Sequence, residues 1–213
     1  DISEDRERFQ KLISKVGLKQ PKSDISLGTK ELVAKSSKLK FPILLRPSYV
    51  LGGRMMEKMA HLDDVQDYID QNYWALENNV ILIDEFLQNA KEVDVDVLRD
   101  IQGNTMIAGI MEHIEEAGIH SGDSACSIPP FSLNDKVISD IKKFSISLAT
   151  ELKTIGLMNI QYAIKDDEIF ILEANPRASR TIPFLAKAIG IPFMKIAAVL
   201  IVGKTFSNED QDF

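Results

Sequence analysis

This chain of 213 residues has a single cysteine and no long apolar run, and its 25 Lys and Arg residues are outnumbered by 32 Asp and Glu residues. The single cysteine, Cys126, rules out a disulfide framework and fits a reducing compartment such as the cytoplasm. The longest apolar stretch, residues 196–202, is too short to cross a bilayer, so a membrane span is not expected. The formal net charge of −7 is not offset by a basic stripe, which argues against general nucleic-acid binding.

What remains is the composition of a globular protein. With 45% apolar residues, the chain can bury a substantial core as one large domain or as two small lobes. It begins at Asp1 without a methionine or a signal-like segment, so we expect a piece of a longer polypeptide.

The order of helical and strand patterns predicts an α+β fold in two parts. The first part is rich in amphipathic helices, with one buried strand over 41–46. The second part has several apolar or alternating strands, a long amphipathic helix over 137–155, a hairpin and two closing helices. Most strand connections are too short for parallel crossovers, so we expect mainly antiparallel sheets. The expected lobes are a small one over 1–78, which includes the N-terminal helix, and a large one over 79–213.

The segment from Glu173 to Arg180 carries the strongest chemical signal. Because side chains alternate along a strand, Glu173 and Asn175 point to the same side. Their carboxylate and amide oxygens suit hard Mg²⁺ or Mn²⁺, which also hold the phosphate oxygens of a substrate. Arg177 and Arg180 follow three residues apart, and guanidinium groups beside such ions stabilise charge on a transferring phosphoryl group. The sequence therefore predicts ATP-dependent phosphoryl transfer.

The predicted hairpin offers a geometric test of this site. Directly opposed residues in an antiparallel pair point to the same face. A loop of odd length, residues 166–168, would place Gln161 opposite Glu173, whereas a two-residue loop would place it opposite Leu172. We therefore predict the odd loop, which lets Gln161, Glu173 and Asn175 converge on one or two cations. Taken alone, Gln161 also fits an ordinary polar residue of a strand.

Two segments of the first part could contact a nucleotide. Arg46 ends a buried strand shortly before the pair Gly52 and Gly53, and paired glycines permit close approach of the backbone to phosphates. A Gly-Gly turn is also a common structural feature. Residues 83–87 leave an apolar strand and could form a hinge whose backbone binds adenine.

Polar residues of the second part offer further candidates. Glu92 could hold ribose hydroxyls, while a solvated strand face is the preferred interpretation for Asp94 and Asp96. The loop 117–124, rich in glycine and hydroxyl groups, could contact the phosphates or the sugar. Cys126 lacks a basic partner in the sequence, so a nucleophilic role is disfavoured.

Three long runs give the chain its resemblance to a known family, the ATP-grasp domain of the large subunit of carbamoyl-phosphate synthetase. The resemblance covers almost the full length and rests on RPSYVLGGR (46–54), GIMEHIE (109–115) and EANPRASR (173–180). That subunit has two homologous halves, of which the first phosphorylates bicarbonate and the second carbamate. The chain resembles the second half in the runs EVDVD (92–96), HSGDSAC (120–126) and RTIPF (180–184).

The resemblance implies an ATP-grasp fold, in which two lobes with mainly antiparallel sheets clamp ATP. It implies that Gln161, Glu173 and Asn175 bind two Mg²⁺ or Mn²⁺ ions, and that Arg177 and Arg180 hold the phosphoryl group and the carbamate. A structural K⁺ near Glu92 and His113 is also implied. The nucleotide contacts that it implies are Arg6, Arg46, Glu85, Leu87, Glu92, Gly118, Ile119, His120 and Ser121.

The expected function is ATP-dependent phosphorylation of carbamate to carbamoyl phosphate, a ligase step that feeds pyrimidine and arginine biosynthesis. The expected partners are carbamate, the remaining domains of the large subunit and a small glutaminase subunit, so the fragment alone should be weakly active or inactive. The apolar helix over 191–202 is expected to pack one face against those missing domains. The alternatives are an ATP-grasp ligase or carboxylase acting on another carboxylate, and a non-catalytic nucleotide-binding regulatory module.

Overall fold

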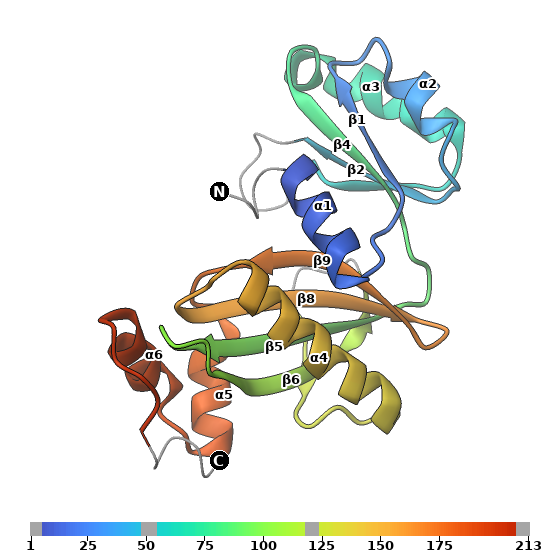
Figure 1. The fold of residues 1–213 in the computed structure, drawn as a ribbon. Helices are drawn as coiled ribbons and strands as arrows, with labels where there is room; N and C mark the ends of the chain where they lie inside the picture. Colours follow the sequence, from blue (N-terminus) through green and yellow to red (C-terminus); the bar gives the residue numbers. More distant parts are fainter. Residues whose placement is uncertain (1–5, 48–54, 118–123, 208–213) are drawn as a thin grey trace. The chain divides into compact units, whose positions relative to one another are not determined.

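A computed structural model describes residues 6–47, 55–117 and 124–207 of the protein (Figure 1). The chain divides into two compact units, one of Pro21–Gln88 and one that combines Asp1–Gln20 with Asn89–Phe213. Among the helices in the described ranges, none combines the length and the apolar character needed to span a membrane.

This division differs from the expected lobes at two points. Helix α1 (Arg6–Val16) joins the larger unit because Phe9 and Ile13 are buried in the same apolar cluster as Leu148 of α4. Strand β4 (Val80–Glu85) joins the smaller unit because it pairs with strands on both of its sides there.

The smaller unit is an antiparallel sheet of order β1-β4-β2-β3 with two helices packed on it. The sequence did not predict β1, because it is an edge strand in which only Ser26 is buried and no apolar run marks it. The elements besides β4 are β1 (Ser23–Leu27), α2 (Leu32–Ser36), β2 (Ile43–Pro47), β3 (Glu57–Met59) and α3 (Leu62–Leu76).

The larger unit is built on an antiparallel sheet of order β7-β6-β5-β8-β9. Its strands are β5 (Lys91–Arg99), β6 (Thr105–Glu116), β7 (Cys126–Ser127), β8 (Gly156–Lys165) and β9 (Glu168–Asn175). Its other helices are α4 (Asp135–Glu151), α5 (Thr181–Ile189) and α6 (Phe193–Ile201).

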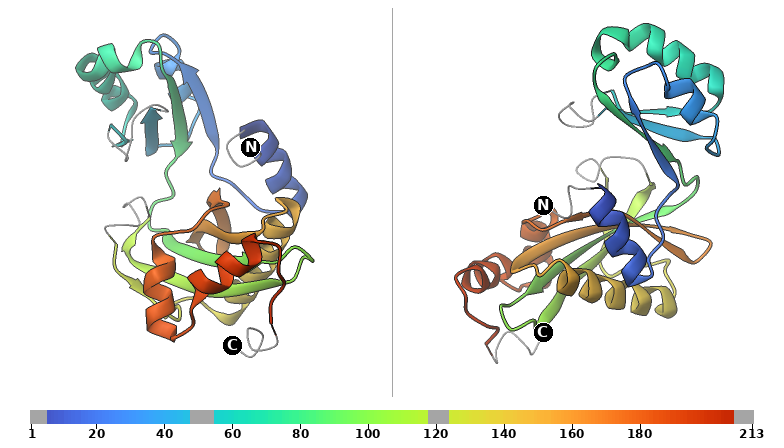
Figure 2. Two further views of the ribbon diagram at one scale, coloured as in Figure 1. Left: turned by 90° about the vertical axis from the view of Figure 1, so that its left-hand side faces the viewer. Right: turned by 45° about the horizontal axis from the view of Figure 1, so that its top comes forward.

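The two faces of this larger sheet are covered differently. Helices α1 and α4 pack on the face that carries Val93, Val95 and Val97, as the alternation along β5 predicted. Helices α5 and α6 pack on the opposite face, around Leu98 and Leu157. The left view of Figure 2 brings α5 and α6 in front of the sheet, with α4 behind it.

Helix α6 buries one side and leaves the other side open. Phe193, Ile196 and Leu200 are buried in the cluster that α6 shares with α5. Met194 and Ile201 are 47% and 63% exposed. The helix is therefore not wholly buried within the described residues. Its exposed side leaves room for the expected packing against further domains.

Candidate active site

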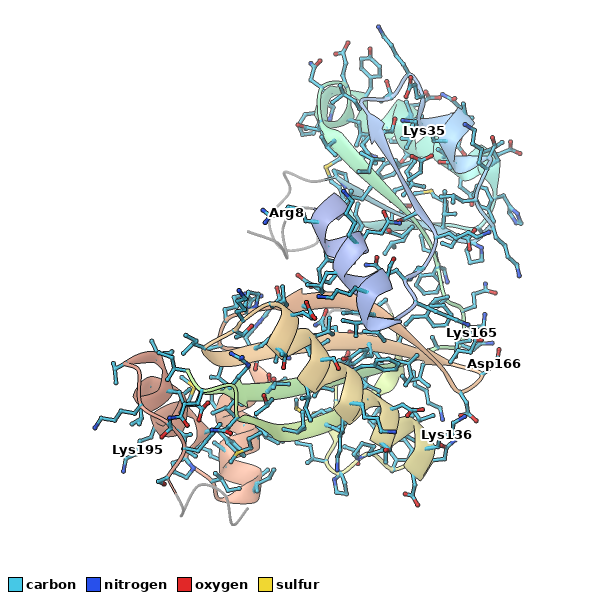
Figure 3. All side chains as sticks on the ribbon, viewed as in Figure 1. Arg8, Lys35, Lys136, Lys165, Asp166 and Lys195 are labelled. Carbon is cyan, nitrogen blue, oxygen red and sulfur yellow. The ribbon has the colours of Figure 1, made fainter. Side chains whose placement is uncertain are left out.

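The hairpin of β8 and β9 places Gln161 directly opposite Glu173, and Asn159 opposite Asn175. The pairing of Gln161 with Glu173 was predicted, but the odd loop that was to produce it was wrong. The turn holds two residues, Asp166 and Asp167, with φ of 51° and 62°. Both dihedrals are left-handed, as in the tight turns that match the twist of a hairpin. Figure 3 shows Asp166 at this turn.

A bulge in β9 restores the register that a two-residue turn would otherwise lose. Tyr162 pairs with Ile171 and Gln161 pairs with Glu173, so Leu172 has no partner in β8. The extra residue moves every later side chain of β9 by one position relative to β8. As a result Ile171 faces the core beside Tyr162, and Glu173 faces the side of Gln161.

Two rows of opposed residues cross the sheet on the face opposite α4. The first row runs Asp94, Gln161, Glu173 and the second runs Asp96, Asn159, Asn175. Residues two apart on a strand share a face, so all six side chains lie on one side of the sheet. Sequence reasoning missed Asn159, although its place two residues before Gln161 was a usable signal.

The predicted metal ligands fit a hard divalent ion. The register brings Gln161 and Glu173 side by side, with Asn175 two residues further along β9. Glu173 is exposed, and Gln161 and Asn175 are partly exposed, so all three are accessible to a ligand. Within the described residues no three acids, histidines or cysteines gather as a metal site, and the predicted set has only one carboxylate beside two amides. Oxygen donors of this kind suit Mg²⁺ or Mn²⁺. Ala174 faces the core instead, with 4% exposure.

The two predicted arginines lie in the connection between β9 and α5. Arg177 donates its backbone N–H to the carbonyl of Asn175 at 2.8 Å and its Nη1 to the carbonyl of Ala178 at 3.2 Å. Arg180 immediately precedes α5. Both side chains are exposed, and they follow directly after the oxygen donors.

Asp94 and Asp96 are buried, with 1% and 0% exposure, so the expected solvated strand face was wrong. The two carboxylates are held in a hydrogen-bond network. Asn159 donates its Nδ2 to Oδ1 of Asp94 at 3.2 Å and to Oδ1 of Asp96 at 3.1 Å. His113 Nε2 lies 2.7 Å from Asp94 Oδ2, and Thr181 Oγ1 donates to Asp96 Oδ2 at 2.6 Å. Buried carboxylates persist where such partners replace water.

The network shifts the protonation of its members. Burial raises the pKa of Asp96, against the effect of hydrogen bonds such as that from Thr181. Burial acts to lower the pKa of His113, but the hydrogen bond and charge of Asp94 outweigh it, and the pKa is raised. His113, near which the resemblance implied a K⁺, is a buried partner of Asp94.

Cys126 lies in β7, next to β6, and is partly buried. Burial, with the charges of Asp94 and Glu115, raises the pKa of its thiol. A raised pKa keeps the thiol protonated at neutral pH, so the sulfur is a poor nucleophile. This agrees with the sequence interpretation.

In the smaller unit, Arg46 is held by an acid on the neighbouring strand. Its Nε and Nη2 donate to Oδ2 of Asp84 at 2.8 and 2.6 Å. The Arg46 side chain is 44% exposed, so the pair fixes its direction without burying it. A guanidinium whose direction is fixed in this way is oriented to bind an anion.

The expected hinge has one backbone donor to offer. The N–H groups of Glu85 and Phe86 are used, since they donate to the carbonyls of Lys22 and Pro42 at 2.8 and 2.9 Å. The Glu85 carboxylate accepts from the backbone N–H of Lys40 at 2.9 Å. Among the described residues, no group accepts from the N–H of Leu87. The N–H of Leu87 is thus the backbone donor of the expected hinge that a ligand could use.

Several predicted nucleotide contacts lie outside the described residues. Glu92 is described and is 5% exposed on β5. Arg6 is the first residue of α1, but its side chain is outside the described part of the structure. The others outside it are Gly52, Gly53, Gly118, Ile119, His120 and Ser121.

Solved structures with the same architecture define the class of fold. A biotin carboxylase–β-γ-ATP complex from Campylobacter jejuni matches 98% of this chain and 48% of its own, with a TM-score of 0.75 and 15% identity. N5-carboxyaminoimidazole ribonucleotide synthetase from Thermus thermophilus matches 97% of this chain and 54% of its own, with a TM-score of 0.75 and 13% identity. The chain therefore has the ATP-grasp fold, an α+β fold with antiparallel sheets, as predicted.

Sequence comparison then shows the family. The family model "Carbamoyl-phosphate synthase L chain, ATP binding domain" matches residues 5–209. The carbamoyl phosphate synthase large chain of Xanthomonas axonopodis pv. citri is 47% identical over 98% of this chain, and that of Archaeoglobus fulgidus is 50% identical over 96%. The chain belongs to the family of ATP-binding domains of carbamoyl-phosphate synthase large chains. It spans 20% and 19% of the length of these two relatives.

Proposed function

We propose that this domain phosphorylates carbamate with ATP, as the ATP-binding domain of the second synthetase half. The observation that carries the proposal is the register of β8 and β9, which sets Gln161 beside Glu173 with Asn175 next along the strand. Three oxygen donors followed by Arg177 and Arg180 form a suitable site for the terminal phosphates of a nucleotide. Family membership supports ATP as the nucleotide.

The residues divide the work by their chemistry. Gln161, Glu173 and Asn175 would hold Mg²⁺ or Mn²⁺, which neutralises charge on phosphate oxygens when bound. Arg177 and Arg180 orient the phosphoryl group and the carbamate and balance the charge that develops during transfer. The proposed nucleotide contacts are Arg6, Arg46, Gly52, Gly53, Glu85, Leu87, Glu92 and residues 118–121, and Glu92 with His113 would border a K⁺ site.

Carbamate is proposed as the acceptor because of the runs over 92–96, 120–126 and 180–184, which resemble the second half. Carbamate is labile in water, so its supply from neighbouring domains of a longer cytoplasmic polypeptide and a glutaminase partner belongs to the same proposal. The chain alone is then expected to turn over slowly. The expected lobes, 1–78 and 79–213, are adjusted in this proposal: α1 belongs with the large lobe and β4 with the small one, in line with the compact units.

The ion site is tested by titrating ATP into the protein with Mg²⁺ and with EDTA in a calorimeter. Mg²⁺ should strengthen ATP binding by about tenfold or more, and Glu173→Gln should remove most of that gain. Glu168→Gln is the matched control, since Glu168 lies on the same strand in an exposed ion pair with Lys19. Equal effects of the two substitutions, or no Mg²⁺ dependence, would refute the site.

The identity of the acceptor is tested by running the reaction in reverse, because carbamoyl phosphate, unlike carbamate, is stable enough to be added to the assay. With MgADP, the phosphorus–oxygen bond to carbamate breaks and a bond to the β-phosphate oxygen of ADP forms, which releases carbamate and ATP. Luciferase detection should show slow ATP formation from carbamoyl phosphate but not from acetyl phosphate, and Arg180→Ala should abolish it. ATP formation at equal rates from both acyl phosphates would contradict a carbamate-specific site.

A further inference from the structure

The link between β5 and the start of α5 is the least expected feature of the larger unit. Asp96 of β5 is 0% exposed, and its Oδ2 accepts a hydrogen bond from Thr181 Oγ1 at 2.6 Å. The two residues are far apart in sequence, so only folding brings them together. A buried carboxylate needs such donors, because they replace the hydrogen bonds that it would make to water.

The hydroxyl groups at the start of α5 are hydrogen-bonded to Asp96 and to each other. Thr181 Oγ1 donates to Asp96 Oδ2, Ser179 Oγ lies 2.7 Å from Thr181 Oγ1, and Ser179 is also a side-chain hydrogen-bond partner of Asp96. Ser179 Oγ in turn accepts from the backbone N–H of Ile182 at 3.2 Å. The Asp96 carboxylate is therefore the common partner of both hydroxyl groups.

A close approach one helical turn later holds α5 on the same spot of the sheet. Gly109 of β6 is the cross-strand partner of Asp96. A Cβ at Gly109 would lie 2.6 Å from Cδ1 of Leu185, which is fully buried. Thr181 and Leu185 are four residues apart and share one face of α5. That face of α5 packs on the cross-strand pair formed by Asp96 and Gly109.

The other end of the arginine-bearing segment is anchored at the same place. Asn175, the last residue of β9, is the cross-strand partner of Asn159. Asn159 is also the cross-strand partner of Asp96 and donates its side-chain amide to that carboxylate. Residues 176–180 therefore form a loop that is tied at one end to Asn159, through Asn175, and at the other end to Asp96, through Thr181. This loop carries Arg177 and Arg180.

We propose that Asp96, acting through Thr181, is a positioning residue that holds Arg177 and Arg180 against the terminal phosphate of ATP. This inference rests on the proposed function, since it assumes that the arginines meet that phosphate. Asp96 is 0% exposed, so its carboxylate is assigned no direct contact with the nucleotide or the acceptor. Its role is to fix the start of α5, and with it the C-terminal end of the loop.

The test measures the preference for ATP over ADP, as the ratio of their dissociation constants in the presence of Mg²⁺. Only ATP carries the phosphate that the arginines are proposed to hold. Thr181→Val removes the hydroxyl at almost constant volume and should reduce the preference for ATP by about fivefold to tenfold, with the affinity for ADP unchanged. Thr181→Ser keeps the hydroxyl and should retain the wild-type preference.

Thr154→Val is the control, because Thr154 is a buried threonine whose hydroxyl contacts Met158 rather than the loop. It should leave the preference unchanged. Asp96→Asn keeps an acceptor for Thr181 but removes the charge, so it should give a smaller loss and serves if Thr181→Val fails to fold. Unchanged ADP affinity shows that each variant is folded.

Two outcomes separate the inference from the function on which it rests. If Arg177→Ala and Arg180→Ala reduce the preference for ATP but Thr181→Val does not, the positioning role is wrong and the proposed function stands. If the two arginine variants also leave the preference for ATP unchanged, the arginines do not bind the terminal phosphate, and the proposed function itself is refuted. A parallel loss of ATP and ADP affinity in Thr181→Val would mean that the hydroxyl serves stability alone and would overturn the inference.

Discussion

Gln161 lies directly opposite Glu173 because the unpaired Leu172 offsets a turn of only two residues. Without that bulge, a regular ladder from the same turn would oppose Gln161 to Leu172, and the acid would move to the other face. A polar pair on which the candidate site depends is thus produced by an irregularity of the strand. Bulges of this kind often lie beside functional sites, where they redirect a side chain.

The turn between β8 and β9 supplies a first prediction. Asp167 has a φ of 62°, which favours glycine. Asp167→Gly should raise the free energy of unfolding in urea by about 0.5 kcal/mol, because the left-handed conformation then costs less. The control is Ser139→Gly in the exposed part of α4, which should lower it by about 0.5–1 kcal/mol. Equal losses in both variants would contradict the turn geometry.

Asp96 should make stability depend on pH in a defined direction. Burial raises the pKa of this carboxyl in the folded state above its unfolded value. The folded state therefore binds the proton more tightly, and the contribution of Asp96 to stability is largest at low pH and falls as pH rises through the raised pKa. Asp96→Asn lacks this titration.

The measurement is urea unfolding of wild type and Asp96→Asn between about pH 4 and pH 8, a range that begins near the pKa of an unfolded aspartate. Wild type should lose stability relative to the variant as pH increases. A gain over the same range would mean that the hydrogen bonds outweigh burial and that the pKa is lowered.

The core between α4 and β8 contains a hydrogen bond that can be tested by a double-mutant cycle. Ser145 Oγ and Tyr162 Oη lie 2.9 Å apart, and both residues are 0% exposed. Tyr162→Phe should cost about 1–2 kcal/mol, since it leaves the serine hydroxyl buried without this partner. Adding Ser145→Ala should cost less than it does in the wild-type background. Additive costs would show that the two hydroxyls do not interact.

Gly109 should be hard to replace because α5 lies so close to it. The added Cβ of Gly109→Ala would meet Leu185 at 2.6 Å, so unfolding should become easier by about 1–3 kcal/mol. In the Leu185→Ala background the obstructing atoms are gone, and the same substitution should cost distinctly less. Thermal unfolding of the four proteins measures the coupling, and a cost independent of Leu185 would refute the close contact.

Local features of this protein could be predicted from the amino-acid sequence. Alternation along β5 assigned the valines to the core, and helical spacing assigned α4, because such periodicities depend only on neighbouring residues. The order of oxygen donors and arginines in 173–180 predicted the chemistry that we propose for the candidate site. It also carried the resemblance to the family that the comparisons show.

The contacts between distant segments could not be predicted from local sequence patterns. The bulge at Leu172, the burial of Asp94 and Asp96, and the joining of α1 to the larger unit depend on contacts between segments far apart in the chain. Alternation alone shows that one face of β5 is acidic. It does not show whether these acids are hydrated by water or are hydrogen-bonded to other side chains. The partners of these two acids are Asn159, His113 and Thr181, which come from three other parts of the chain. The acidic face of β5 is therefore buried because distant segments pack against it, which no local pattern could predict.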